Sequence, residues 1–185
     1  MSRPRTVSWL LLICTTCLFL STVSAQDAAP TYQMPPQAIA NLVDAPLTPA
    51  LRVDPSSTWM LLLQRSSLPS IAELSQPELR IAGLRINPAN NDRSRVSLYT
   101  GMTLKHMASG AEKRINGLPG TGGIGNVYWS PAGTHIGFTV SLPDRVELWV
   151  ADVSAGRAGR IMAEPLNAAY GRPFYWASDS RTIIS

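Results

Sequence analysis

The sequence predicts an all-β protein, an incomplete β-propeller with two four-stranded blades and the start of a third, which follows a signal peptide and a short helix. The first observation is a repeat: residues 127–138 (VYWSPAGTHIGF) return in altered form as residues 174–185 (FYWASDSRTIIS). Repeats at such a period are typical of arrays whose units pack on their neighbours. The second observation is that four short apolar segments, separated by turn residues, fit between residues 126 and 165. That is the content of one propeller blade.

Residues 1–25 have the three parts of a signal peptide. Two arginines near the start are followed by an apolar run over residues 7–20 and by the small residues VSA at positions 23–25, which a signal peptidase needs. The run is shorter than the roughly 20 residues that span a hydrocarbon core. We therefore expect an exported protein, periplasmic or secreted, with no stable membrane span after cleavage. An uncleaved membrane anchor is the alternative.

The composition of the rest of the chain excludes two further classes. Both cysteines, Cys14 and Cys17, lie in the apolar run, so the mature chain is held by burial without disulfides. The formal net charge is +4, but the basic residues are scattered and Arg93 and Arg95 are the nearest approach to a cluster. A nucleic-acid interface would need a basic stripe with aromatic stacking partners. We expect no nucleic-acid partner.

Residues 26–49 are expected to form a polar leader and a short amphipathic helix. Two prolines precede residues 37–44, where Ile39, Leu42 and Val43 fall on one helical stripe. A proline at or before the first turn of a helix is tolerated, and two further prolines end this one. We expect the helix to pack on the outside of a larger body.

The predicted partial propeller occupies residues 50–185, and its clearest blade is residues 126–165. Ser130 and Gly133 stand at the first and fourth positions of a type I turn. Residues 146–152 carry apolar side chains on both faces, as expected of a strand sandwiched between stacked sheets. The four strands of this blade are expected at residues 127–129, 136–140, 146–152 and 158–163.

The other two blades are less regular. Residues 50–118 follow the same pattern with an insertion over about residues 66–95. Within the insertion, Ser70 and Glu73 have the spacing of a helix capping box. Residues 173–185 supply the start of a third, truncated blade.

One glycine-rich segment matches a nucleotide-binding pattern without its context. Residues 120–125 read GTGGIG and satisfy G-x-G-x-x-G. A dinucleotide site needs a helix after this loop, whereas a strand and a Ser-Pro turn follow here. We expect a flexible link between blades and no cofactor.

No residue qualifies as catalytic, cofactor-binding or metal-binding. His106 and His135 are the only histidines, and neither has the further ligands that a metal site needs. Ser109 lies in a repeat turn with no matching base or orienter, and the sequence contains no G-x-S-x-G nucleophile elbow. The tryptophans that recur at blade positions are better explained by core packing than by a ligand cage; they are Trp59, Trp129 and Trp176.

Several of these stretches together resemble the N-terminal part of the prolyl oligopeptidase (S9) family of serine peptidases, in particular its glutamyl-endopeptidase-like and dipeptidyl-aminopeptidase-like bacterial members. The resemblance covers nearly all of the mature chain. It is specific because it includes the first part of the mature chain, which does not belong to the repeat. The matching stretches are residues 32–36 through 44–49, 70–74, 77–80, 83–88, 129–131 and 147–152.

The resemblance implies a propeller that caps an α/β-hydrolase domain and restricts entry to peptides. In the family, the Ser, Asp and His of the catalytic triad lie in that hydrolase domain, towards the C-terminus. None of those positions exists in this sequence, so the chain is expected to be truncated before the catalytic domain and inactive alone. Peptides are the expected partners once a catalytic domain is joined.

A different class of function stays open. The alternative to the favoured peptidase fragment is a non-enzymatic propeller-type binding or scaffold protein of the cell envelope. In either case, self-association through exposed blade edges is expected, because an open array leaves sheet edges unpaired. The coding sequence past Ser185 discriminates between the two classes.

Overall fold

The computed structural model describes residues 33–185. The predicted signal peptide, residues 1–25, lies outside the described residues. The described residues divide between Leu42 and Val43 into two units, which are described separately.

Helix α2 (Gln37–Val43) is short and begins directly after two prolines. The carbonyl of Pro36 accepts from the backbone N–H groups of Ile39 and Ala40 at 2.9 and 3.1 Å, so the proline stands at the N-terminus of the helix, where a missing N–H costs nothing. Its apolar side chains are largely exposed, Leu42 by 77%. The packing role predicted for this helix therefore stays a prediction.

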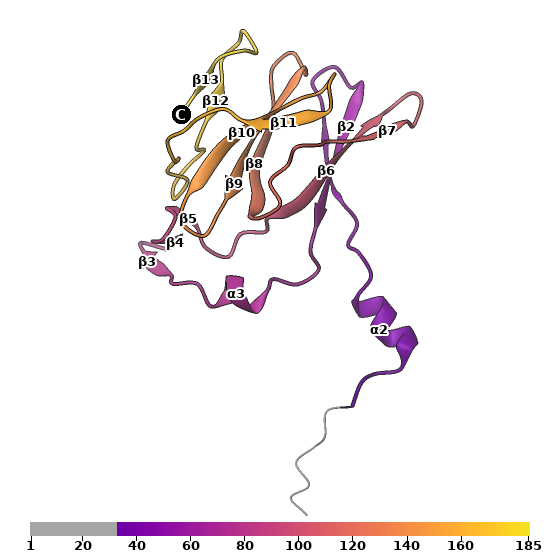
Figure 1. The fold of residues 1–185 in the computed structure, drawn as a ribbon, viewed down its shortest axis with the longest axis vertical. Coiled ribbons are helices and arrows are strands. Elements are labelled where there is room, and N and C mark those ends of the chain that lie inside the picture. The colour runs from indigo at the N-terminus through magenta and orange to yellow at the C-terminus, as the bar shows by residue number, and fades with distance from the viewer. Residues whose placement is uncertain (1–32) are drawn as a thin grey trace, which may run out of the picture. The chain divides into compact units, whose positions relative to one another are not determined.

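The regular structure of residues 43–185 is almost entirely antiparallel strand, which confirms the all-β class (Figure 1). The first set pairs in the order β1-β2-β6-β7, and the second in the order β8-β9-β10-β11. A single pairing, Tyr99 with Ile124, joins the two sets through β6 and β8. The strands are β1 (Ala50–Val53), β2 (Trp59–Arg65), β6 (Tyr99–His106), β7 (Glu112–Arg114), β8 (Gly123–Trp129), β9 (His135–Ser141), β10 (Val146–Asp152) and β11 (Arg157–Arg160).

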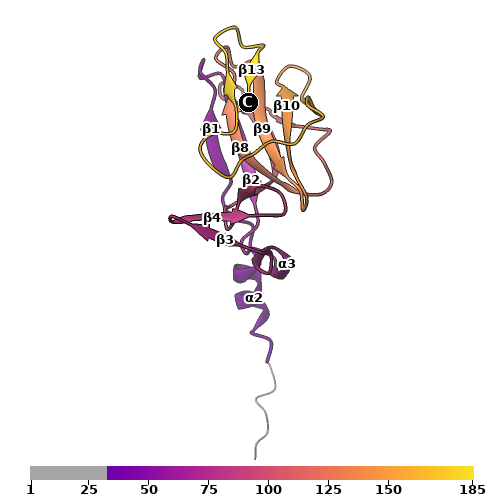
Figure 2. The same ribbon diagram turned by 90° about the vertical axis from the view of Figure 1, so that its left-hand side faces the viewer.

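Two smaller pieces complete this unit. Between β2 and β6 lies the insert, which contains a short helix and a three-stranded sheet, visible below the main sheet in Figure 2. After β11, a two-stranded hairpin follows. The elements are α3 (Ile71–Leu74), β3 (Leu79–Ile81), β4 (Leu84–Asn87), β5 (Asp92–Arg93), β12 (Tyr175–Trp176) and β13 (Ile183–Ile184).

The sheet β8–β11 carries a buried cluster on each face. On one face, Phe138 packs with side chains of β2 and β6 such as Leu61 and Leu104. On the other, Val146 and Leu148 pack with Phe174 and the hairpin. This confirms that residues 146–152 are sandwiched. The tryptophans pack as predicted: Trp59 and Trp129 against the first cluster and Trp176 against the second.

Three turns of the same kind connect β1 to β2, β8 to β9 and β12 to β13. In the first, the Asp54 carboxylate accepts from the backbone N–H groups of Thr58 and Trp59 at 2.7 and 2.9 Å. In the second, the carbonyl of Ser130 accepts from Gly133 at 2.9 Å, and Gly133 has φ +70°. Glycine adopts this left-handed conformation without steric cost, and Ser57 and Ser180 adopt it at the equivalent positions of the other two turns, with φ of 56° and 58°.

Consecutive turns touch one another. The Ser180 hydroxyl of the third turn accepts from the backbone N–H of Ala132 in the second at 2.8 Å. A Cβ on Gly133 would lie 3.0 Å from Oδ2 of Asp54 in the first. The three turns therefore form a row across successive strand sets.

Candidate functional site

A pocket of about 680 Å³ lies between the insert and the ends of the main strands. Its walls are the connection from Arg65 into α3, the segment that runs from β5 to β6, the start of β8, and the loop after β9. Its volume is within the range of ligand sites, about 300–1,000 Å³. The sequence did not predict this pocket, because its walls are brought together only by the insert.

Local hydrogen bonds explain how the insert folds beside the pocket. Ser70 caps α3, since its hydroxyl accepts from the backbone N–H of Glu73 at 3.1 Å, as the capping-box spacing predicted. The amide of Asn87 donates to Gln76 at 2.7 Å, which links β4 to the segment that follows α3. The amide of Asn90 donates to the carbonyl of Leu142 at 2.7 Å and so fixes the insert to the loop after β9.

Glu78 is the centre of an ion-pair cluster at the edge of the pocket. It accepts from Arg80 Nε at 2.9 Å, from Arg85 at 3.3 Å and from Arg95 Nε at 3.0 Å. Its side chain is only 11% exposed. The hydrogen bond from Arg80, together with that from Arg95, holds the pKa of Glu78 below its usual value. Three guanidinium groups therefore share one carboxylate.

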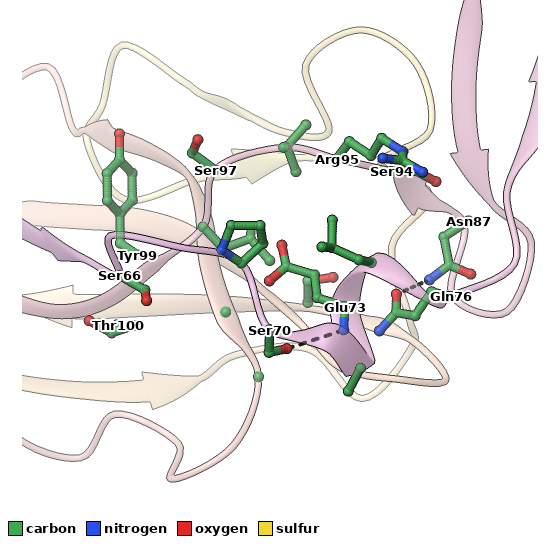
Figure 3. A pocket seen from close by; sticks show the side chains of 18 of the residues that line it. Ser66, Ser70, Glu73, Gln76, Asn87, Ser94, Arg95, Ser97, Tyr99 and Thr100 are labelled. Carbon is green, nitrogen blue, oxygen red and sulfur yellow. Dashed lines mark hydrogen bonds between the residues drawn. The ribbon is translucent and has the colours of Figure 1, made fainter. Parts of the chain in front are cut away.

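Figure 3 shows the side chains inside the pocket. The Glu73 side chain reaches into it, and serine hydroxyls surround it. The carboxylate of Glu73 and the guanidinium of Arg65, which also lines the pocket, make no ion pair within the described residues. The hydroxyl oxygen of Ser94 is buried without a hydrogen-bond partner in the same part of the chain. The pocket thus offers free charges, while the Ser94 hydroxyl beside it is covered by other atoms.

The structure places a histidine beside Ser109, a contact that the sequence analysis missed. Nδ1 of His106 lies 3.0 Å from the Ser109 hydroxyl oxygen, so the prediction that this serine has no matching base is wrong. The same Nδ1 also accepts from the backbone N–H of Ser109 at 3.2 Å, and that hydroxyl accepts from Ala111 N–H at 3.3 Å. These are the contacts of an exposed turn. The i, i+3 spacing of His106 and Ser109 could have indicated them.

A catalytic triad needs a third group that orients the base, and His106 has no carboxylate partner among the described residues. Its ring instead stands edge-on to Trp59, with centroids 5.0 Å apart. The other histidine, His135, lies 3.9 Å from Asp152. Within residues 33–185, no group of three or more His, Cys, Asp or Glu side chains is placed to hold a metal ion.

The glycines of residues 120–125 are packed more tightly than predicted. Gly123 and Gly125 belong to β8, so the expectation of a flexible link is wrong for this part of the motif. A Cβ on Gly123 would lie 2.5 Å from Leu98, and one on Gly125 would lie 3.2 Å from the same side chain. Gly123 has to be a glycine because Leu98 of the β5–β6 connection packs directly on the strand, and Gly125 has little room beside the same side chain.

No helix of the described residues is long and apolar enough to cross a membrane. No protein-family model matches the chain.

The comparison with curated proteins gives two clear relatives. The probable chloroplastic glutamyl endopeptidase of Oryza sativa subsp. japonica is 36% identical over 166 residues, which is 83% of this chain and 18% of the relative. The protein of the same name from Arabidopsis thaliana is 36% identical over 166 residues, 83% of this chain and 17% of the relative. The chain thus spans under a fifth of the length of these relatives.

Among solved structures, the acylaminoacyl peptidase of Pyrococcus horikoshii matches with a TM-score of 0.44 at 13% sequence identity. The match covers 77% of this chain and 17% of that structure.

Proposed function

Because this chain is an S9 peptidase-like N-terminal region, related to the glutamyl endopeptidases, we propose that it forms the N-terminal propeller part of an exported serine peptidase. In that role it limits access of peptides to an α/β-hydrolase domain that follows in the whole protein. The main support for the proposal is the 36% identity over 166 residues to a probable glutamyl endopeptidase. We expect the propeller part to have no peptidase activity by itself.

The arrangement of strands supports a propeller, with blades at residues 50–118 and 126–165 and the start of a third at 173–185. Each consecutive set packs face to face on the next through one of the two buried clusters. When the turns at Asp54 and Ser130 are aligned, Met60 and Leu62 correspond to Ile136 and Phe138, which face the preceding set. The equivalent face of β2 therefore has the pattern of a surface that receives another blade.

That face of the first set carries apolar side chains in contact with solvent. Leu51 and Val53 of β1 pair with Leu62 and Met60 of β2, so the four side chains share one face of the sheet. Leu51 is 52% exposed and Val53 is 44% exposed. In a closed propeller this face would be covered by a further blade.

The coding sequence beyond Ser185 tests the proposal. We expect it to continue, in frame or after a frameshift, into more blades and a G-x-S-x-G elbow. A second arm assays the purified chain on fluorogenic peptides, where we expect no turnover because no Ser-Asp-His triad is assembled among the described residues. A downstream region without any hydrolase remnant contradicts the proposal. Turnover that follows the protein through purification contradicts the second expectation, and the Ser109→Ala variant then shows whether Ser109 is responsible.

The apolar face of β1 and β2 also favours the second candidate, a propeller-type scaffold protein of the cell envelope that closes by self-association. A clean stop after Ser185, without downstream blades, would support it. Stable dimers or larger closed assemblies of the purified chain in sedimentation experiments would support it as well.

A further inference from the structure

Building on the proposed function, in which the chain meets peptides, we propose that Arg172 binds the free C-terminal carboxylate of a peptide. Arg172 lies in the connection from β11 to β12. It does not line the pocket beside the insert, so this is a second and separate site.

Arg172 is a partly buried cation without an anionic partner. Within residues 33–185 it forms no ion pair with any carboxylate. Its Nε is buried and has no hydrogen-bond partner among the same residues, whereas its two terminal nitrogens are still reached by solvent. Withdrawal of an unpaired charge from water is costly. An incoming anion would remove part of this cost.

Two tyrosine rings hold the guanidinium in place. Its Cζ lies over the ring of Tyr128, 3.6 Å from the centroid, and 4.9 Å from the centroid of the Tyr175 ring, and both distances are within the range of cation–π attraction. Tyr128 is itself fixed, because it packs against the second buried cluster and stands edge-on to Phe174 at 5.5 Å. A guanidinium stacked in this way is oriented before the ligand arrives, which lowers the cost of binding.

The charges near Arg172 favour an anion. Nη2 of Arg93 donates to the carbonyl of Gly171 at 3.4 Å, so a second guanidinium reaches the residue next to Arg172. Arg93 also forms no ion pair within the described part of the chain. Two positive charges that no carboxylate balances there thus meet at one short segment. A carboxylate is the planar anion that the fork of an arginine binds best, through two parallel hydrogen bonds.

The strand that follows Arg172 favours a chain end as the source of this carboxylate. Strand β12 begins three residues after Arg172 and pairs on one edge with β13. Its other edge pairs with no strand of residues 33–185, and an open edge can pair with the main chain of an extended peptide. Three residues span at most about 10 Å, so a peptide that ends beside β12 brings its terminal carboxylate near Arg172. Main-chain pairing leaves the type of the last residue free.

The test measures the fluorescence anisotropy of a short peptide without acidic residues, labelled at its N-terminus, with the purified full chain as receptor. The peptide is made twice, once with a free C-terminus and once with a C-terminal amide. We expect the free acid to bind about three- to tenfold more tightly, as for one charge-assisted contact that is partly exposed. High salt should reduce this preference.

Variants of Arg172 show whether the preference depends on this side chain. Arg172→Gln should bind the acid and the amide equally, and Arg172→Lys should keep only part of the preference, since lysine has the charge without the fork. A purely structural role of Arg172 predicts a different result, in which the affinity for both peptides falls by the same factor. Arg181→Gln is the control, because it removes the same charge in the β12–β13 turn and should leave the preference unchanged.

The orienting role of Tyr128 is tested in the same assay. Tyr128→Phe retains the aromatic ring over which the guanidinium lies and should keep the preference. Tyr128→Leu removes the ring without a change of charge and should reduce the preference. Thermal melts of all variants identify any that fail to fold, and the comparison of the two peptides on the unchanged protein decides the proposal even then.

Several results would overturn the proposal. They are equal binding of the acid and the amide, a preference that survives in a folded Arg172→Gln variant, and an equal effect of Arg181→Gln. Displacement by acetate at concentrations as low as those of the peptide would show a site for small anions only. An amidated peptide with one internal aspartate, bound with the same dependence on Arg172, would show that the site does not select a chain end.

The outcome is separable from that of the proposed function. Absence of a preference for the free acid would leave the coding-sequence test for a peptidase untouched. A preference that depends on Arg172, found together with a downstream region without any hydrolase remnant, would refute the peptidase proposal alone.

Discussion

Replacing Gly137 by alanine should weaken the packing of the hairpin β12–β13 and its lead-in on the second strand set. Gly137 lies in β9, on the face that meets Phe174 and Trp176. A Cβ there would stand 2.7 Å from Phe174 Cε2 and 3.1 Å from Trp176 Nε1. Phe174 is fully buried, so its ring cannot turn out into solvent to make room.

The size of the effect follows from two opposing terms. Overpacking of a filled core costs about 1–3 kcal/mol. Against it, a glycine-to-alanine change at an unstrained backbone position stabilises by about 0.4–1 kcal/mol through the unfolded state. The net loss should be about 1–2 kcal/mol. For a domain of this size, that corresponds to a decrease in Tm of roughly 2–8 °C.

Gly159→Ala is the matched control. Gly159 lies in β11, and a Cβ there would meet nothing within 4 Å, so only the favourable term applies. Urea unfolding followed by tryptophan fluorescence, at two protein concentrations, measures both variants. If Gly137→Ala and Gly159→Ala shift the midpoint equally, the hairpin does not pack on β9 in solution and the stacked arrangement is refuted.

Three further outcomes are expected. Residues 26–185 expressed alone should self-associate, because sheet faces and edges are open; a chain that stays monomeric in sedimentation as its concentration is raised would contradict this. Ser180→Ala should cost about 1–2 kcal/mol in urea unfolding, since the N–H of Ala132 loses its acceptor, and an unchanged midpoint would show that the turns do not touch. Burial raises the pKa of Asp54, but hydrogen bonds from Ser56, Trp59 and Thr58 outweigh it and set the pKa below 3.8. The stability that Asp54 provides is therefore complete above about pH 3.8 and is lost as the pH falls through the lower pKa of the folded state. Asp54→Asn should make the free energy of unfolding less dependent on pH in this range. If the variant shows the same pH dependence as the unchanged protein, the Asp54 carboxylate does not make these hydrogen bonds in solution.

Features that depend on near neighbours in the sequence were predictable. The Ser130 turn, the capping by Ser70 and the two-faced pattern of residues 146–152 each rest on residues a few positions apart. Their local chemistry decides between turn, helix and sandwiched strand without reference to the rest of the chain.

Features whose cause lies elsewhere in the chain were not predictable. Gly123 is glycine because of Leu98, which nothing in the G-x-G-x-x-G pattern indicates. Arg95 reaches Glu78 across 17 positions, and Asn90 reaches Leu142 across 52. These contacts build the pocket, and no periodicity in the sequence reports them. The pocket could therefore be found only from the structure.

The row of turns has a consequence for the order in which the chain folds. Each turn contacts only the turns of the strand sets next to it, Asp54 beside Gly133 and Ala132 bonded to Ser180. A strand set can therefore dock as soon as it has been synthesised, with the preceding set as its template, and no contact along the row has to wait for a distant segment. The row therefore allows folding to proceed from the N-terminus onward, in the direction in which a ribosome delivers the chain.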